Sequence, residues 1–324
     1  MDGRYTWPGC SLNDGMMPMP TPLYLLIAGA PKCGTSSLFS YLKDHPDVCA
    51  CRFKEPRFFA DEVHMTSVQP PFVVAAARRK DFAVYQNLFP CSERSVWCEA
   101  SPVYIYSRAA AERIKAALPR VKLVFILREP VDRLVSSFLM LHRIHRLPRH
   151  MTFEAFVQMQ SRDDTDNMAE SRLVWGCYSR YLKIYYDLFD PQDILVVGFH
   201  QLRDSPLSVM QQISEFAGID PEFYQGFDFR VYNRAGDYRV KWLDSVYQRG
   251  IHWVRNRIVP YPRFFTPLHA LNERYFIPLY ESLNRTDAPK PDIPAHVRAE
   301  LEAFYADEAD ELYKLTGKAD LLQS

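Results

Sequence analysis

Three short runs of apolar residues stand out along the chain, and each is followed by a polar turn. They cover residues 23–29, 121–127 and 193–199, with the sequences LYLLIAG, VKLVFIL and DILVVGF. Apolar runs of this length are typical of strands that are buried on both faces of a sheet. We therefore expect these three segments to lie in one central, mostly parallel sheet.

Segments with apolar residues at helical spacing separate these runs. The pattern predicts helices over residues 36–44, 107–117, 171–189 and 206–217, one that begins at Pro130, and a terminal helix within 293–317 that ends at Gly317. Strands that alternate with helices predict an α/β fold with helices flanking the sheet. We expect a single domain over residues 23–324, preceded by an N-terminal extension of residues 1–22.

Composition excludes several classes of function. The 39 basic residues balance 39 acidic ones, so no overall field attracts nucleic acid or an anionic membrane. The seven scattered cysteines show no zinc spacing, which predicts reduced thiols and no bound metal. Residues 1–22 lack the pattern of a signal peptide, and the apolar run after them is too short to cross a bilayer. A cytoplasmic protein without a stable membrane anchor is the expectation, and its oligomeric state stays open.

The turn after the first apolar run has the character of an anion-binding loop. The stretch GAPKCGTSSL places Lys32 and Gly34 before the hydroxyls of Thr35, Ser36 and Ser37, at the start of a helix. Backbone N–H groups at a helix N-terminus, with nearby hydroxyls, bind anions, and a lysine adds a full charge. The order of residues differs from the GK[ST] of nucleoside triphosphatases, and an ordinary capped helix with a solvated Lys32 is the alternative.

A second candidate anion loop follows the second apolar run. In LREPVDRLVSSF, Arg128 ends the strand, and Ser136 lies about two turns into the following helix. Arginine offers a planar fork of donors that suits a phosphate group. Alone, this pattern favours a surface arginine paired with Glu129 or Asp132, followed by an ordinary helical serine. Because both loops fall at the carboxyl edge of one sheet, they predict a ligand with two separated phosphate-like groups.

At this point the sequence resembles a known family. PKCGTSSL is similar to the 5′-phosphosulfate loop, and LREPVDRLVSSF to the 3′-phosphate motif, of sulfotransferases that use 3′-phosphoadenosine 5′-phosphosulfate (PAPS). The heparan-sulfate 3-O/N-sulfotransferase type and its bacterial relatives look most similar. The stretches FKEPRFF, CEASPVYIYS and YSRYLKIYYDLF support the resemblance, which runs from about residue 23 to the C-terminus.

The resemblance implies a role for each matching residue. The 5′-phosphosulfate of PAPS, and of the product PAP, would be held by Lys32, Cys33, Gly34, Thr35, Ser36 and Ser37, and the 3′-phosphate by Arg128 and Ser136. Lys32 would also neutralise charge on the leaving phosphate. Glu55 would be the general base, with Lys54 beside it, and an ion pair with Lys54 or Arg57 is the alternative. Weaker similarity assigns Tyr238 and Arg239 to the nucleotide, and Glu99 and Tyr104 to the acceptor pocket or to the core.

The resemblance implies sulfuryl transfer without a metal, from PAPS to a hydroxyl or amine. We expect the acceptor to be a small molecule, a lipid or a glycan, and we expect no nucleic acid as partner. Where the heparan-sulfate enzymes carry a lysine, CEASPVY has Ala100, which weakens the inference of a polysaccharide acceptor. Two alternatives remain: a P-loop kinase or nucleoside triphosphatase, and a non-catalytic module that binds PAP or a glycan on the same scaffold.

Overall fold

A computed structural model describes most of the chain. It covers residues 21–61, 71–91, 93–144, 146–148, 150–162, 172–230, 236–238, 285–287 and 291–323. Within these ranges the central feature is a parallel sheet of five strands in the order β2-β3-β1-β4-β5. Its strands are β1 (Leu23–Gly29), β2 (Val48–Ala50), β3 (Val96–Ala100), β4 (Val121–Leu127) and β5 (Ile194–Gly198).

The predicted fold class is therefore confirmed, and the sheet is larger than the sequence indicated. The three expected strands are β1, β4 and β5, and β1 lies at the centre of the sheet. The two additional strands, β2 and β3, extend the sheet beyond β1. β2 has only three residues, and β3 contains the charged residue Glu99, so neither gives a continuous apolar run.

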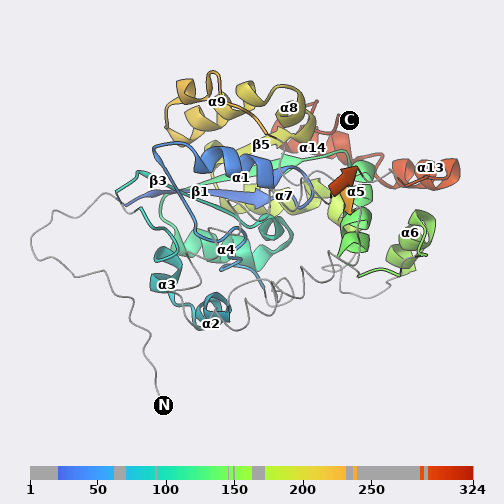
Figure 1. The fold of residues 1–324 in the computed structure, drawn as a ribbon, viewed down its shortest axis with the longest axis horizontal. Helices are drawn as coiled ribbons and strands as arrows, with labels where there is room; N and C mark the ends of the chain where they lie inside the picture. The colour runs from blue at the N-terminus through green and yellow to red at the C-terminus, as the bar shows by residue number, and fades with distance from the viewer. Residues whose placement is uncertain are drawn as a thin grey trace, which may run out of the picture.

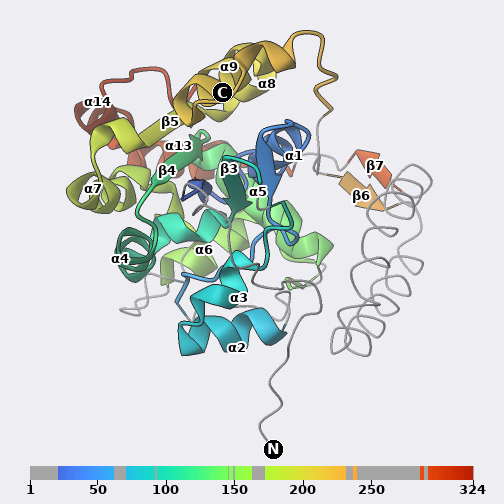
Figure 2. The same cartoon turned by 90° about the vertical axis from the view of Figure 1, so that its left-hand side faces the viewer.

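Helices cover both faces of the sheet (Figures 1 and 2). One face carries α1 (Thr35–Lys43), α8 (Phe199–Asp204) and α9 (Pro206–Ala217), and the other carries α4 (Arg108–Ala117) and α7 (Tyr178–Leu188). α2 (Pro71–Arg79), α3 (Phe82–Gln86) and the 3-10 helix η2 (Pro102–Tyr106) lie between β2 and α4 in the chain. All five strands are almost completely buried, as strands covered on both sides must be.

A smaller apolar cluster lies to one side of the sheet, where α5 (Pro130–Arg143), α6 (Phe153–Arg162) and α13 (Ala295–Phe304) meet (Figure 1). Leu134, Phe138 and Leu141 of α5 belong to this cluster. The predicted terminal helix is divided into α13 and α14 (Glu308–Thr316), which ends at Gly317 with a φ of 70°. The chain turns between them so that the Glu308 carboxylate accepts hydrogen bonds from Ser179 N–H and O–H, at the start of α7.

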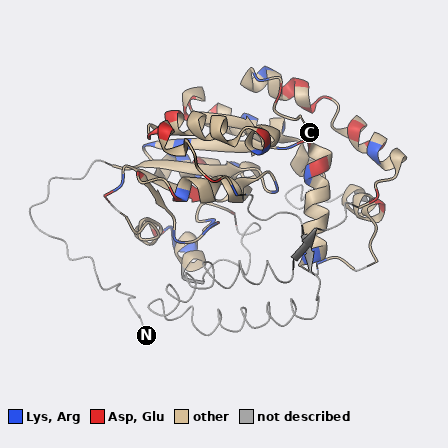
Figure 3. Cartoon of the chain, turned by 45° about the horizontal axis from the view of Figure 1, so that its top comes forward, with Lys and Arg blue, Asp and Glu red and all other residues tan. Residues whose placement is uncertain are grey.

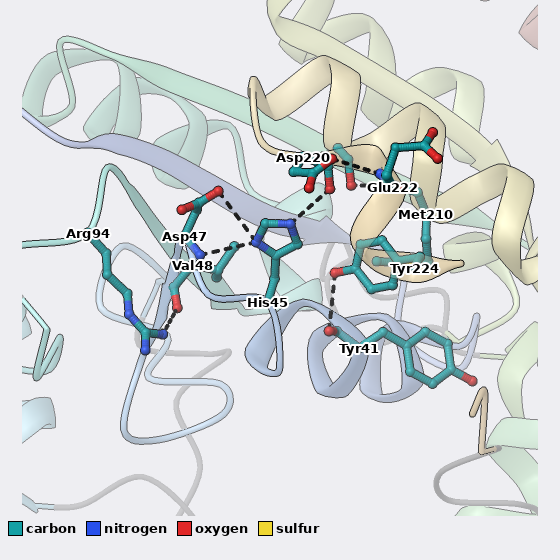
Figure 4. Close-up of polar contacts among 10 residues, drawn as sticks. Tyr41, His45, Asp47, Val48, Arg94, Met210, Asp220, Glu222 and Tyr224 are labelled. Atoms are coloured by element: carbon teal, nitrogen blue, oxygen red, sulfur yellow. Dashed lines mark hydrogen bonds and ion pairs between the residues drawn. The ribbon is translucent and has the colours of Figure 1, made fainter. Parts of the chain in front are cut away.

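The end of α1 is fixed by buried polar contacts (Figure 4). Asp47 N–H donates to His45 Nδ1 over 3.1 Å, and His45 Nε2 lies 2.9 Å from the carbonyl oxygen of Asp220. Because one ring nitrogen accepts and the other faces a carbonyl, the neutral ring with hydrogen on Nε2 satisfies both contacts. The Tyr224 hydroxyl donates to the carbonyl of Tyr41 on the same helix. These contacts hold the end of α1 against residues 220–224, which follow α9 in the chain.

Two further short strands, β6 (Gly236–Tyr238) and β7 (Arg285–Asp287), pair in antiparallel register. Within the described ranges, no helix combines the length and the apolar character that crossing a bilayer requires.

Candidate active site

Three polar segments meet at the carboxyl edge of the sheet. The first is the loop of residues 30–34 after β1, and the second is the turn after β4, where Arg128 stands. The third contains Glu55, whose N–H donates to the carbonyl of Ala100 at the end of β3 over 2.8 Å. Since β1 lies between β3 and β4, the sheet order brings all three together at one edge. This edge is the usual ligand-binding position in open parallel sheets.

The loop after β1 is shaped to approach an anion. Lys32 and Gly34 have φ values of 73° and 86°, in the left-handed region that glycine adopts most easily. A Cβ on Gly34 would lie 2.9 Å from the ring of Phe199, so this position also lacks room for a side chain. Gly34 is the N-cap of α1, and no side chain caps this helix terminus. The first backbone N–H groups of α1 are therefore available to a ligand.

Lys32 carries the charge of this loop. Among the described residues, no carboxylate forms an ion pair with its half-buried amine. Burial lowers the pKa of this amine to about 8, and the charges of Arg143, Lys54 and Arg128 contribute to the decrease. Several cations therefore converge on this loop in a chain with no net charge. A dianionic ligand would relieve their mutual repulsion and raise the pKa of Lys32 again.

The other predicted residues of this loop differ in how accessible they are. Thr35 and Ser37 are buried, and Ser36 is half-buried, at the first turn of α1. The Cys33 side chain is completely buried, and its Sγ lies 3.7 Å from the hydroxyl of Tyr178. Cys33 can thus contribute only backbone groups to a ligand, whereas Ser36 can contribute a hydroxyl.

The turn after β4 is built differently. Glu129 precedes Pro130 and accepts hydrogen bonds from Val131 N–H and Asp132 N–H, at 2.9 and 2.7 Å, so α5 has its own carboxylate as a cap. Arg128 pairs with Asp132 at 3.2 Å, which is one of the partners that the sequence left open. The buried Nε of Arg128 has no hydrogen-bond partner among the described residues. Ser136 is half-buried on the same helix.

Phe199, the first residue of α8, connects the two loops. Its ring lies 4.8 Å from the guanidinium carbon of Arg128, in a cation–π contact, and it closes the space beside Gly34. No sequence signal indicates this role, because an aromatic residue after a buried strand is ordinary core composition.

Glu55 forms ion pairs with both of the cations considered from the sequence. Its carboxylate oxygens lie 2.9 Å from Lys54 Nζ and 2.6 Å from Arg57 Nη2. Burial alone would raise the pKa of this carboxyl, but the charges of Lys54 and Arg57 outweigh that effect and lower it to about 2. Glu55 is therefore ionised at neutral pH and can accept a proton, although the two cations reduce its basicity.

Glu99 and Tyr104 lie in the core, which was one of the two positions left open for them. Both side chains are fully buried. The Glu99 carboxylate accepts hydrogen bonds from the hydroxyls of Ser101, Tyr104 and Tyr85 at 2.7, 3.0 and 3.2 Å. Burial raises the pKa of Glu99 to about 7 despite these bonds. Their assignment to an acceptor pocket is thus at odds with their position, because a side chain without exposed surface cannot contact an acceptor.

The two residues that the weaker similarity assigned to the nucleotide, Tyr238 and Arg239, come late in the chain. Tyr238 lies in strand β6, where the structure gives its backbone, and Arg239 lies outside the described residues.

Two other residues were missed as site candidates. Arg57 anchors Glu55, and Arg143 lies seven residues after Ser136, which places both on one side of α5. That spacing is a signal that the sequence did contain.

Away from the edge of the sheet that carries Lys32, basic and acidic residues are distributed over the described chain. In Figure 3, basic and acidic positions of the described chain are interspersed and are not gathered on one element. In the same ranges, no group of three or more His, Cys, Asp or Glu side chains is arranged to hold a metal ion. The cations near Lys32 are therefore a local feature of one edge of the sheet.

Comparison with known proteins agrees with this geometry. Residues 23–227 match the family described as "Sulfotransferase domain", which is more than half of the chain and includes both loops. The chain belongs to this family. The identification made from the two loop motifs is thereby confirmed.

Similar proteins fall within the same family. The mouse heparan sulfate glucosamine 3-O-sulfotransferase 3A1 is 26% identical over 219 residues, which are 66% of this chain and 50% of that protein. The mouse bifunctional heparan sulfate N-deacetylase/N-sulfotransferase 4 is 25% identical over 61% of this chain and 22% of its own length. The chain therefore spans half or less of these curated relatives. A solved sulfotransferase from Alicyclobacillus acidocaldarius shares the fold, with a TM-score of 0.60, 22% identity and coverage of 92% and 96% of the two chains.

Proposed function

We propose that this sulfotransferase-family chain moves a sulfuryl group from PAPS to a hydroxyl or amine of an acceptor. One observation supports this most directly. Within the part of the chain that the structure describes, the N-terminus of α1 beside Lys32 has no side-chain cap and the Nε of Arg128 has no partner, and the two lie at adjacent strand ends. A ligand with a 5′-phosphosulfate and a separate 3′-phosphate would occupy both loops.

The residues present fit that ligand. Gly34 has a left-handed backbone, and its surroundings leave no space for a Cβ. Because this position carries no side chain, a phosphate group can approach the backbone N–H groups at the start of α1. When bound, PAPS supplies the sulfuryl group. Lys32 then neutralises the negative charge that develops on the leaving phosphate oxygen, which is electrostatic stabilisation of the transition state. Arg128 and Ser136 hold the 3′-phosphate, and that contact favours PAPS over ATP.

Glu55 is the proposed general base for an acceptor hydroxyl. It accepts the proton as the acceptor oxygen bonds to sulfur, and the bond from sulfur to the leaving phosphate oxygen breaks. Lys54 and Arg57 fix the carboxylate at the edge of β3, and the charge of Lys54 also acts on Lys32. Replacement of Glu55 by Gln should lower kcat by about a hundredfold or more while PAP binding persists. A Glu154→Gln variant, altered at an exposed ion pair with His296, is a suitable control.

The acceptor is proposed only as a class. The names of the relatives designate heparan sulfate, whereas Ala100 replaces the lysine expected from the enzymes that act on it. We propose a small molecule, a lipid or a glycan, in a cytoplasmic location as the sequence predicts.

A thermal-shift titration tests the donor. At a hundred times its Kd, PAP should stabilise the protein by about 2.7 kcal/mol, whereas ATP–Mg should not. Stabilisation by ATP–Mg alone would favour a P-loop kinase instead. If PAP stabilises the protein but no sulfated product forms from PAPS with glycan, lipid or phenolic acceptors, a non-catalytic binding module would be favoured.

A further inference from the structure

One buried hydroxyl touches both anion loops. Tyr178 is the first residue of α7 and has no exposed surface. Its hydroxyl donates to the backbone carbonyl of Arg128 over 2.9 Å, and it lies 3.7 Å from the Sγ of Cys33. Arg128 belongs to the loop after β4, and Cys33 stands between Lys32 and Gly34 in the loop after β1. The buried Tyr178 side chain therefore contacts both loops from the protein interior.

The direction of these two hydrogen bonds follows from their chemistry. A carbonyl oxygen can only accept, so the single hydroxyl proton of Tyr178 points to Arg128. The Cys33 thiol can then only be the donor in its own contacts, and its single proton is within reach of the Pro31 carbonyl at 3.6 Å and the Tyr178 oxygen at 3.7 Å. Burial raises the pKa of both Cys33 and Tyr178, so each keeps its proton at neutral pH. The Tyr178 hydroxyl is thus in contact with the Cys33 sulfur on one side and hydrogen-bonded to the Arg128 carbonyl on the other.

A buried arginine reinforces this arrangement. Arg133 of α5 is fully buried and donates to the carbonyl of Arg172 and, over 3.5 Å, to the hydroxyl of Ser137. Its charge acts on Tyr178 and Cys33 and opposes the rise in their pKa. Through Arg172, the helix that carries Ser136 is connected to the segment just before α7. Arg133 therefore ties α5 to the chain that leads into Tyr178.

We propose that Tyr178 is a positioning residue that sets the distance between the two anion loops. In this way it selects a nucleotide with two phosphate groups at the spacing of a 3′,5′-bisphosphate. The proposal rests on the proposed function, because it assumes that the two loops bind one nucleotide. Tyr178 itself, being buried, touches no ligand. Its effect should be confined to ligands that contact both loops at once.

The test compares two nucleotides that differ only in the 3′-phosphate. Tyr178→Phe keeps the ring and removes the hydroxyl, and binding of PAP and of adenosine 5′-monophosphate is measured by isothermal titration calorimetry. PAP should bind roughly tenfold more weakly, as expected for a lost buried hydrogen bond, and the monophosphate should change by less than about twofold. The ratio of the two affinities is the readout, since a general loss of stability does not change it.

A matched control lies on the same helix. Tyr185 is also fully buried, and its hydroxyl donates to the backbone carbonyl of Tyr104, away from both loops. Tyr185→Phe should lower the thermal midpoint without changing the affinity ratio. Cys33→Ala interrupts the link at its other end, and it should lower the ratio by a smaller factor because a thiol is a weak donor. This second variant tests the proposal even if Tyr178→Phe does not fold.

The outcomes separate this proposal from the proposed function. Weaker PAP binding with an unchanged monophosphate, in Tyr178→Phe but not in Tyr185→Phe, supports a positioning role. If both nucleotides weaken equally in Tyr178→Phe, or if neither variant at the link changes the ratio, the positioning role is wrong although PAP still binds the wild type. A folded wild-type protein that does not bind PAP would instead overturn the proposed function, and this proposal with it.

Discussion

The two anion loops are both strand–turn–helix units, and they differ in how the helix begins. At α1, Gly34 is the N-cap, no side chain caps the helix, and Lys32 has no carboxylate partner among the described residues. At α5, the Glu129 carboxylate already accepts the first backbone N–H groups, and Arg128 is paired with Asp132. The first loop therefore leaves its helix N-terminus open, whereas the second fills it with a carboxylate of its own.

This difference indicates that the two loops have different functions. An open helix N-terminus offers backbone donors and a partial positive charge, which suits a group whose charge changes during reaction. A capped terminus can hold an anion only through side chains, here Arg128 and Ser136. The loop after β1 should thus control turnover, and the loop after β4 should control affinity and the choice of nucleotide.

The largest expected effect comes from removing the charge of the first loop. Lys32→Ala should lower kcat by about a hundredfold to a thousandfold, the range for losing one group that stabilises developing charge. PAP binding should weaken much less, because the backbone donors of α1 remain. Steady-state kinetics and calorimetry on the same preparation separate the two quantities. Equal losses in turnover and in PAP affinity would contradict the proposed division between the loops.

Removing the side-chain donor of the second loop should have the opposite profile. Arg128→Ala should weaken PAP binding by roughly tenfold to a hundredfold, as expected for charge-assisted hydrogen bonds. Binding of adenosine 5′-phosphosulfate, which lacks the 3′-phosphate, should stay nearly constant. Arg203→Ala is a control, because that arginine forms an exposed ion pair with Asp204. If both nucleotides lose affinity to the same extent, Arg128 does not bind the 3′-phosphate.

The pKa of Lys32 predicts how PAP affinity depends on pH. The free amine has a pKa of about 8, and a bound anion raises the pKa above that value. The charge of Lys32 therefore contributes fully to PAP affinity below about pH 8. Above it, binding is accompanied by proton uptake, and affinity falls by a total factor no larger than the weakening of PAP binding in Lys32→Ala. Calorimetry at pH 7, 8 and 9 in buffers of different ionisation enthalpy measures both effects.

Lys32→Arg is the matched control for this pH dependence, since a guanidinium stays charged throughout the range. The decrease above pH 8 should disappear in this variant. A wild-type affinity that is flat between pH 7 and 9 would mean that the amine does not contact the ligand.

The contrast between the two loops also shows what the sequence can predict. The three apolar strand segments and both loops were found because their signals are local: mostly continuous apolar residues, a glycine, a proline and an arginine at strand ends. Strand β3 was missed because it contains Glu99, and the hydroxyls that make this charge tolerable come from Tyr85, Ser101 and Tyr104. No pattern within residues 96–100 indicates that hydroxyls outside this strand will donate hydrogen bonds to the Glu99 carboxylate.

The candidate site was limited by the same kind of information. Glu129 and Asp132 were both possible partners of Arg128, and only the folded chain shows that Asp132 pairs with it while Glu129 caps the helix. The connection of the two loops through Phe199 and Tyr178 joins segments that are far apart in sequence, and nothing in either segment indicates the other. Likewise, the break between α13 and α14 depends on Ser179, which Glu308 reaches across the fold.

The smallest effect concerns the carboxylate that competes for Arg128. Asp132→Asn removes an anion from the proposed 3′-phosphate site and releases the guanidinium from an ion pair at 3.2 Å. PAP should then bind more tightly by roughly twofold to fivefold, the size expected for a partly exposed pair, with kcat unchanged. Glu129→Gln is the comparison, because it weakens the cap of α5 and should lower the thermal midpoint without tightening PAP binding. Tighter binding of adenosine 5′-phosphosulfate in Asp132→Asn by the same factor would show that the effect is a general change in charge, and it would remove the distinction between the two loops.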